Sequence, residues 1–469
     1  MRLVYKFGGT SMAGTERITH AAGLALAGAK THELVVVVSA MDGVTEQLLD
    51  LAAAAGSGNR ARVYSLLGTI RSGHEQAARG LGGEAPAKVE GLLAKLETLA
   101  GGILAVGELT DRLQDAVVAY GEKLSSVMMG VAMRCPALDG QEAGIVTTDH
   151  FGEADPLMEL STHNIAQNVV PLLGVGRPVV VAGFIAANQR GVVTTIGRGG
   201  SDYTATILGA AIKADEIHIW SDVDGLMTAD PRVVPGAKLL ERISFAEAVE
   251  LGKFGAKSMH PRALEPAAVY GIPVRMRSTF KPENAGTLID GAAAGVDGAG
   301  AGSGSGAVRA VPMLKNLAMI TIGGAGMIGR PGTAAAVFDA LALARVNVHM
   351  ICQSVSEAGI SVVVAQGQVG KARAALEQAL LKHQGPAALA DHAVKSVEVQ
   401  EDLVVIAVVG AGMKGTPGVA AKAFTAMAEK AVNIIAIAQG SSELSIALAV
   451  RAEDAKLAVA AIHERFGLG

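Results

Sequence analysis

The stretch Gly197-Arg198-Gly199-Gly200-Ser201-Asp202 separates two segments with opposite structural preferences. Before it, residues 191–196 read Gly-Val-Val-Thr-Thr-Ile, a β-branched run that predicts a strand. After it, residues 203–211 are rich in helix formers. Glycines allow positive φ and close approach of a ligand to the backbone, and a helix N-terminus offers unpaired N–H groups to an anion. The stretch therefore predicts a ligand-binding glycine loop of an α/β fold, although a plain strand-to-helix turn has the same local pattern.

A second glycine loop lies at residues 4–11, which read Val-Tyr-Lys-Phe-Gly-Gly-Thr-Ser. A first strand here runs into Gly-Gly and then into helical sequence. Lys6 would lie near the carboxyl end of that strand, where open α/β sheets bind ligands. Its mobile ammonium group can follow a phosphoryl group during transfer. In the first loop, Arg198 and Asp202 supply a cation and a carboxylate, which suits a ligand that bears both charges, such as an α-amino acid.

Composition limits the class of protein. The 469 residues exceed one ordinary domain, and 50% apolar with 18% charged residues can form large cores. The net charge is −4, and the sequence has no cluster of basic residues of the kind that binds a phosphate backbone. Nucleic acid is therefore not expected as a partner. No membrane span or signal-peptide pattern is found, so no membrane association is expected. Cys135 and Cys352 fit neither a disulfide framework nor a metal spacing, which favours a cytoplasmic protein.

Together, Lys-Phe-Gly-Gly-Thr-Ser at 6–11 and Gly-Arg-Gly-Gly-Ser-Asp at 197–202 resemble the motifs of aspartate kinases, within the amino-acid kinase superfamily. The resemblance implies an α/β protein. An amino-acid kinase fold, a parallel-rich open sheet covered by helices, would occupy residues 1–290, and two ferredoxin-like α+β ACT domains would follow. It also implies ATP- and Mg²⁺-dependent phosphorylation of L-aspartate to 4-phospho-L-aspartate, the first step in the biosynthesis of lysine, threonine and methionine.

Three further motifs resemble that family. Tyr-Gly-Glu-Lys-Leu-Ser-Ser at 120–126 is similar to its Gly-Glu-x-x-Ser-Ser element, although a helical glutamate is usually a solvated residue. Residues 223–232 resemble its nucleotide-binding stretch, with methionine at 227 where the family has tyrosine, which puts one aromatic contact to the nucleotide in doubt. Phe-Gly-Ala-Lys-Ser-Met-His-Pro at 254–261 resembles its Phe-Gly-Ala-Lys-x-x-His-Pro element. We interpret His260 as a helix-start residue without a chemical role.

The resemblance implies roles for individual residues. Lys6 and Asp202 would be catalytic, and Asp202 would orient either Lys6 or the substrate amine, alternatives that the sequence does not separate. Arg198 would bind the α-carboxylate of aspartate and Glu122 its α-ammonium. Thr45 would also touch the substrate, but it could equally cap the helix that follows. The implied substrate contacts are Thr45, Glu122, Arg198, Gly199 and Ser201. The implied ATP contacts are Lys6, Gly8, Gly9, Ser11, Ser221, Asp222, Met227, Asp230, Arg232, Lys257 and Ser258. No protein ligand is named for the metal, since ATP oxygens can hold most of it.

The C-terminal part of the chain contains an internal repeat. Residues 291–306 are almost entirely Gly, Ala and Ser and predict a flexible linker. Beyond it, Ile-Gly-Gly-Ala-Gly-Met-Ile-Gly-Arg-Pro-Gly at 322–332 returns as Val-Val-Gly-Ala-Gly-Met-Lys-Gly-Thr-Pro-Gly at 408–418. Each unit is too small to bury its sheet well unless it is paired. The two units resemble tandem ACT domains over 307–390 and 391–469, although a duplicated structural cap is the alternative.

The ACT resemblance implies feedback control. A regulatory amino acid, threonine somewhat more than lysine from the wording of the motifs, would bind near the repeated positions Asn347, Gln353, Asn433 and Gln439. Paired modules expose sheet edges, so a homodimer or higher homo-oligomer is expected. Two other hypotheses remain open: an amino-acid kinase that acts on acetylglutamate or glutamate, and a non-catalytic amino-acid sensor that kept the fold.

Overall fold

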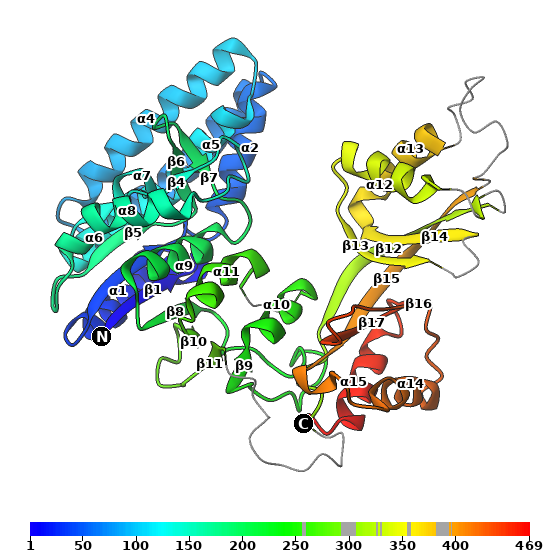
Figure 1. The fold of residues 1–469 in the computed structure, drawn as a ribbon. Helices are drawn as coiled ribbons and strands as arrows, with labels where there is room; N and C mark the ends of the chain where they lie inside the picture. Colours follow the sequence, from blue (N-terminus) through cyan, green and yellow to red (C-terminus); the bar gives the residue numbers. More distant parts are fainter. Residues whose placement is uncertain are drawn as a thin grey trace. The chain divides into compact units, whose positions relative to one another are not determined.

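The structure, a computed structural model, describes residues 1–255, 259–291, 306–324, 327–328, 331–353, 358–380, 394 and 396–469 (Figure 1). These residues form two compact units. The first contains the described residues within 1–226, 239–252 and 257–294, and the second contains those within 227–238, 253–256 and 295–469. Two short segments of the predicted catalytic region therefore belong to the second unit. The predicted linker lies outside the described residues, except for its end residues 291 and 306.

The first unit is built on an eight-stranded open sheet with the order β3-β5-β2-β1-β8-β10-β11-β9. Neighbouring strands are parallel except β10 and β11, as predicted for a parallel-rich sheet. The central strands are buried along nearly their whole length because both faces of the sheet are covered. The strands are β1 (Arg2–Phe7), β2 (Glu33–Val38), β3 (Ala137–Leu138), β5 (Val179–Ala182), β8 (Glu216–Ser221), β9 (Arg242–Ser244), β10 (Val274–Ser278) and β11 (Thr287–Asp290).

Helices cover both faces of this sheet. Tyr5 of β1 lies against Gly28 of α1 (Thr15–Ala29), where a Cβ would come within 2.8 Å of the tyrosine hydroxyl. On β8, Ile217 lies against Gly209 of α9 (Gly200–Ile212). Because Ile217 is paired with Val4 and successive side chains alternate between faces, α1 and α9 lie on opposite faces.

One predicted strand is divided in two. The apolar run at 178–186 predicts a single buried strand, but it forms β5 and β6 (Ile185–Asn188), separated by Gly183 and Phe184. Phe184 has φ +63°, which turns the chain out of the large sheet. β6 then pairs with β7 (Val193–Thr195) and β4 (Val146–Thr147) in a three-stranded sheet. This small sheet carries the glycine loop at 197–202.

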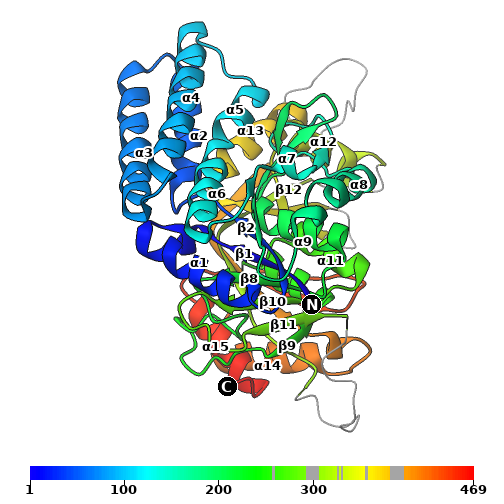
Figure 2. The same ribbon diagram turned by 90° about the vertical axis from the view of Figure 1, so that its left-hand side faces the viewer.

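Residues 57–133 have poor strand propensity and long amphipathic stretches, which predicts helices broken near residues 80–86 and at Gly101-Gly102. The structure confirms the helices, with one difference. α3 (Arg60–Leu81) and α4 (Ala85–Val106) are separated near Gly82, as expected, but Gly101 and Gly102 do not interrupt α4. Both glycines are exposed on the helix surface, so tertiary packing of the other face of α4 stabilises the helix in spite of them. Figure 2 shows α3, α4 and α2 (Val44–Gly56) packed side by side. The other helices of this unit are α5 (Asp111–Val118), α6 (Tyr120–Met133), α7 (Gly140–Ala143), α8 (Met158–Asn168), α10 (Phe245–Lys253) and α11 (Pro261–Tyr270).

The second unit contains the two repeats on one antiparallel sheet with the order β13-β14-β12-β15-β17-β16. Each repeat reads strand, helix, strand, strand, helix. The long first strands of the repeats pair with each other: Ile322 lies opposite Val397, and Met313 lies opposite Ile406. The elements are β12 (Met313–Gly323), α12 (Thr333–Leu343), β13 (Val348–Gln353), β14 (Gly359–Ala365) and α13 (Val369–Leu380), then β15 (Ser396–Val409), α14 (Val419–Glu429), β16 (Ala436–Gln439), β17 (Ser445–Arg451) and α15 (Ala455–Arg465).

The segment 227–238 is part of the core of the second repeat. Ala229 and Val234 are buried in the same cluster as Met427 of α14 and Ile462 of α15. Thr228 Oγ1 lies 2.9 Å from His463 Nε2, and the N–H of Val311 donates to the carbonyl oxygen of Thr228. A piece of the predicted nucleotide-binding stretch is thus held by the C-terminal repeat.

Candidate active site

Lys6 and Asp202 form an ion pair at the carboxyl edge of the central sheet. Lys6 is the fifth residue of β1, and Asp202 lies in the first turn of α9. Lys6 Nζ lies 2.5 Å from Asp202 Oδ1, and the side chains are only 11% and 15% exposed. The sequence left open whether Asp202 faces Lys6 or the substrate amine. In this structure, Asp202 pairs with Lys6.

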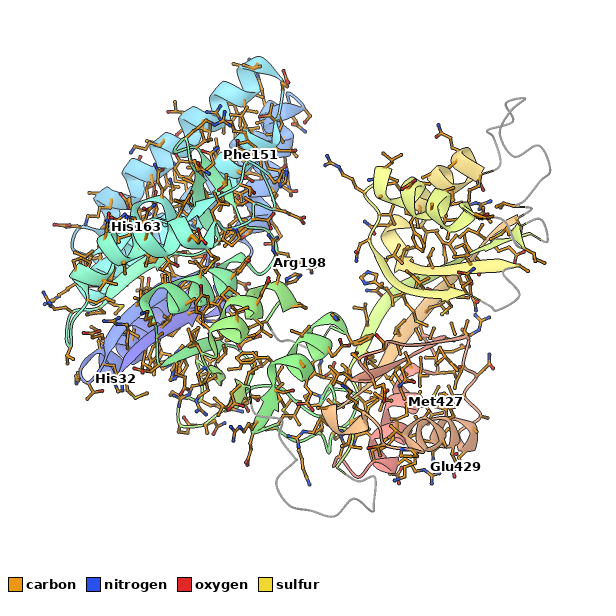
Figure 3. All side chains as sticks on the ribbon, viewed as in Figure 1. His32, Phe151, His163, Arg198, Met427 and Glu429 are labelled. Atoms are coloured by element: carbon orange, nitrogen blue, oxygen red, sulfur yellow. The ribbon has the colours of Figure 1, made fainter. Side chains whose placement is uncertain are left out.

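The glycine loop has the backbone that its sequence predicts. Gly197 has φ +77°, and Gly199 has φ +73° at the N-cap of α9, conformations that residues with a Cβ rarely adopt. A Cβ on Gly199 would also lie 2.6 Å from that of His260. Arg198 is exposed at the tip of this loop (Figure 3), and no ion-pair partner is found for it in the part of the chain that the structure describes. Its guanidinium group is available to an anion.

Glu122 is buried rather than solvated. It lies in the first turn of α6 and is 3% exposed. Oε1 accepts a hydrogen bond from the N–H of Ala40 at 3.1 Å, whereas Oε2 has no hydrogen-bond partner among the described residues. Burial raises the pKa of Glu122 to about 8, opposed by the N–H of Ala40 and by the charge of Lys6. The site thus contains a buried carboxylate oxygen that lacks a donor.

Thr45 and Ser201 lie in the first turns of α2 and α9. The N-cap of α2 is Gly43, with φ +75°, so the interpretation of Thr45 as the helix cap is wrong; Thr45 is the second helical residue and is half-buried. Ser201 is buried in the first turn of α9 and packs against Gly183, where a Cβ would lie 2.7 Å from that of Ser201.

The glycine loop at residues 4–11 joins two neighbouring strand ends. The N–H of Gly8 donates to the carbonyl oxygen of Trp220 in β8 at 3.2 Å. A Cβ on Gly9 would lie 3.1 Å from the carbonyl oxygen of Ala40, in the loop after β2. The Ser11 hydroxyl is fully buried and lies 2.7 Å from Thr279 Oγ1. In this structure the Ser11 side chain therefore fastens the loop, while its predicted contact with ATP stays a prediction.

The other predicted ATP contacts fall in three places. Ser221 ends β8 and Asp222 follows it in the first unit. Met227, Asp230 and Arg232 belong to the second unit, where Arg232 Nη2 lies 2.8 Å from Asp230 Oδ2. Lys257 and Ser258 lie outside the described residues.

His260 lies beside the glycine loop, which the sequence did not predict. It is the N-cap of α11, followed by Pro261, so its interpretation as a helix-start residue is confirmed. Partial burial and the nearby charge of Arg198 lower the pKa of His260. The His-Pro pair indicated the start of a helix, but no local signal indicated that this start faces Gly199.

The predicted regulatory residues occupy matching positions in the two repeats. Asn347 and Asn433 lie just before β13 and β16, and Gln353 and Gln439 end these strands. All four side chains are exposed. The register inferred from the sequence repeat is thus matched by the structure, while effector binding stays a prediction.

Within the described residues, no group of three or more His, Cys, Asp or Glu side chains is arranged to hold a metal ion. No described helix combines the length and apolar character that a membrane crossing requires.

Comparisons with known proteins identify the family of this chain. The model of the amino acid kinase family matches residues 1–278, and that of the ACT domain matches 320–380 and 406–466. The aspartokinase of Helicobacter pylori is 32% identical over the full length of both chains. The chloroplastic bifunctional aspartokinase/homoserine dehydrogenase 1 of Zea mays is 34% identical over 99% of this chain. This chain spans about half the length of that relative, 50%.

Solved structures give the same result. The crystal structure of E. coli aspartokinase III in complex with aspartate and ADP superposes with a TM-score of 0.81, at 29% identity over 99% of both chains. The structure of the same enzyme in complex with lysine and aspartate gives a TM-score of 0.80, also at 29% identity over 99% of both chains.

Proposed function

Because this chain belongs to the amino acid kinase family, and within it to the aspartokinases, we propose that it transfers the γ-phosphoryl group of ATP to the side-chain carboxylate of L-aspartate. The family resemblance inferred from the two glycine loops is thus correct. The observation that carries the proposal is the arrangement of charges: the Lys6–Asp202 pair lies at the sheet edge, and buried Glu122 has a carboxylate oxygen for which the described residues offer no donor. The E. coli relative is described with aspartate and ADP, which supports aspartate as the acceptor and an adenine nucleotide as the partner in the transfer.

Recognition of aspartate rests on two opposite charges. Glu122 Oε2 accepts a hydrogen bond from the α-ammonium group of the substrate. This contact satisfies a buried carboxylate oxygen that has no hydrogen-bond partner among the described residues. Arg198 pairs with the α-carboxylate, for which its planar guanidinium group is suited. Thr45, Gly199 and Ser201 line the remainder of the substrate site. The side-chain carboxylate of the substrate is then free to react.

Phosphoryl transfer needs positioning and charge neutralisation more than a base. The substrate carboxylate is already ionised at neutral pH and attacks the γ-phosphorus directly. Lys6, held by Asp202, neutralises charge that moves onto the transferred group. The N–H of Gly9 faces the same oxygens, whereas that of Gly8 is engaged with the carbonyl oxygen of Trp220. The first turn of α9 adds its N-terminal dipole.

Mg²⁺ fits this site mainly through the phosphates of ATP. Asp202 is engaged with Lys6, and the described residues contain no cluster of three ligands, so the protein contributes few direct ligands. When bound with ATP, Mg²⁺ supplies further charge neutralisation on the phosphates.

We also propose feedback control by an amino acid bound at the repeats, with Asn347, Gln353, Asn433 and Gln439 near the effector. The E. coli relative is described with lysine as well as aspartate. Threonine or lysine is the expected effector, in a cytoplasmic homodimer or larger homo-oligomer.

A coupled ADP-release assay tests these proposals. The full chain is assayed with ATP and Mg²⁺ on aspartate, glutamate and acetylglutamate, each with and without threonine, lysine and methionine. Turnover of aspartate alone, reduced by threonine or lysine, is expected. Turnover of acetylglutamate or glutamate instead would favour another amino-acid kinase, and no turnover with any substrate would favour a sensor without activity.

A further inference from the structure

Asp115 is a buried carboxylate to which the mechanism so far gives no part. It lies in α5 and is 2% exposed. Its Oδ2 accepts hydrogen bonds from the N–H groups of Gly152 and Thr195, both at 2.9 Å. Its Oδ1 accepts a hydrogen bond from Thr195 Oγ1 at 2.7 Å. Three donors from two separate chain segments thus converge on one side chain.

Both segments adjoin the glycine loop. Thr195 is the last residue of β7, two residues before Gly197. Gly152 also lies against Gly197, where a Cβ would be 3.5 Å from the carbonyl oxygen of Gly152. The N–H of Ala154 donates to the carbonyl oxygen of Thr195, so the two segments are also joined directly. Asp115 therefore fixes the start of the loop that carries Arg198.

The same carboxylate is tied to Glu122 through the backbone. Only Ala119 separates α5 from α6, and Glu122 lies in the first turn of α6. α5 packs against β7 in the structure (Figure 1). The helix pair that positions the ammonium contact and the loop that positions the carboxylate contact are thus joined at Asp115.

We propose that Asp115 is a positioning residue that sets the spacing between Glu122 and the Arg198 loop, and so determines how well an α-amino acid fits. This inference rests on the proposed roles of Glu122 and Arg198. Loss of the Asp115 carboxylate leaves the N–H groups of Gly152 and Thr195 unpaired inside the protein. The loop then moves to satisfy them, and Arg198 moves with it.

The first test compares kinetic constants of the full-length protein. Asp115→Ala is expected to raise the KM for aspartate about tenfold or more and to leave the KM for ATP within about twofold, because only the loop of the amino-acid contact shifts. Asp115→Asn is expected to restore a near-normal KM for aspartate. Its amide oxygen can accept from both backbone N–H groups while its NH₂ group donates to the Thr195 hydroxyl. An unchanged KM for aspartate in Asp115→Ala would overturn the proposal.

A second variant keeps the test decisive if Asp115→Ala does not fold. Thr195→Val removes only the hydroxyl donor and is expected to raise the KM for aspartate severalfold without changing that for ATP. The opposite result, an unchanged KM for aspartate in this variant, would overturn the proposal. Glu247→Ala is the matched control, since Glu247 is another buried carboxylate of the first unit and accepts hydrogen bonds from Ser244. It should leave the KM for aspartate unchanged even if it lowers Tm.

Hydrogen exchange separates the positioning role from the proposed activity. Peptides that cover 150–154 and 194–200 should exchange faster in Asp115→Ala than in the wild type, and at the wild-type rate in Asp115→Asn. If the wild type does not phosphorylate aspartate but this exchange pattern is found, the proposed activity fails, and the positioning of the loop by Asp115 is still supported. If exchange in these peptides is the same in Asp115→Ala and the wild type, the positioning role of Asp115 is refuted.

Discussion

Glu122 and Arg198 offer the proposed substrate opposite charges in opposite environments. Glu122 is buried, with one oxygen held by the N–H of Ala40, and its pKa is raised to about 8. Arg198 is exposed on a loop with positive-φ glycines on both sides. Burial makes the ionised form of Glu122 costly until a cation arrives, whereas the exposed guanidinium group of Arg198 pays no such desolvation cost before an anion binds.

The raised pKa of Glu122 predicts that aspartate binding near pH 7 releases a proton. Without substrate, the carboxyl group is largely protonated at this pH, since its pKa is about 8. The substrate ammonium favours the ionised form, so affinity for aspartate should increase as pH rises from about 6 to 8. Calorimetry at pH 7 in two buffers of different ionisation enthalpy measures the release. Equal heats in both buffers would contradict this prediction, and Glu122→Gln is the control without release.

The raised pKa of Glu122 also makes the free energy of unfolding depend on pH. A carboxyl group with a raised pKa in the folded state binds more protons there than in the unfolded chain. Its contribution to the free energy of unfolding therefore decreases as pH rises from its ordinary pKa of 4.5 towards 8. Glu122→Gln should remove this pH dependence from the substrate-free protein.

Arg198→Ala is expected to raise the KM for aspartate with little effect on ATP binding. Loss of one partner of a charge pair in a ligand site costs on the order of 2 to 4 kcal/mol. Steady-state kinetics with each substrate varied in turn measures the effect. An aspartate KM equal to that of the wild type would remove Arg198 from the substrate site.

Lys6→Met is expected to lower kcat about a hundredfold or more while aspartate and ADP still bind. The ammonium group acts mainly on charge that develops during transfer, so its loss raises the barrier more than it weakens binding. Turnover is measured together with calorimetric binding of both ligands. A kcat within a few-fold of the wild type would refute the catalytic role.

At the scale of secondary structure, glycines act in two different ways in this chain. In the glycine loop and in the β10–β11 hairpin they adopt positive φ beside a neighbouring backbone or side chain. In α4, by contrast, Gly101 and Gly102 face open space in ordinary helical conformation. The local sequence does not distinguish these uses, because both depend on what surrounds the glycine.

Gly101→Ala is therefore expected to stabilise the protein by up to about 1 kcal/mol, because alanine restricts the unfolded chain and meets no neighbour in α4. Gly286→Ala is the contrasting variant: Gly286 has φ +72°, and its Cβ would lie 1.9 Å from the carbonyl oxygen of Met276. Chemical denaturation of both variants checks this prediction. A loss of stability in Gly101→Ala would show that the glycine pair has a role in α4 that its exposure does not reveal.

At the scale of the whole molecule, the two compact units are not two continuous stretches of sequence. Residues 227–238 lie within the region matched by the amino acid kinase family, yet they complete the core of the second repeat. Their contacts there include the hydrogen bond between Thr228 and His463. An effector that alters the second repeat can therefore act on this segment directly, and allosteric coupling of this kind is typically about 1 to 3 kcal/mol.

A fragment of residues 307–469 is expected to be less stable than the same region in the full chain. Without the segment 227–238, the apolar surface that packs against Ala229 and Val234 is exposed to water. The fragment should bind an apolar dye, and a peptide of residues 227–238 should displace the dye and raise Tm. The same peptide with Val234→Asp is the control. A fragment that melts as the full chain does, with no effect of the peptide, would contradict the prediction.

The sequence by itself determined the features that depend on residues close together along the chain. The two glycine loops, the buried β-branched strands, the helical region and the C-terminal repeat each follow from local composition and spacing. The motifs among them carry the resemblance that implied the family and the fold, and the same resemblance implied roles for Lys6, Glu122, Arg198 and Asp202. The division of 178–186 into two strands and the continuity of α4 were not predicted, since packing decided both.

Only the tertiary structure decided which charged residues pair with each other and which distant segments pack into the same core. It paired Lys6 with Asp202, buried Glu122 beneath the loop at Ala40, and placed Asp115 between Gly152 and Thr195. It also assigned residues 227–238 to the second unit. Desolvation and hydrogen-bond geometry depend on groups that are far apart along the chain, so no local pattern in the sequence can encode them.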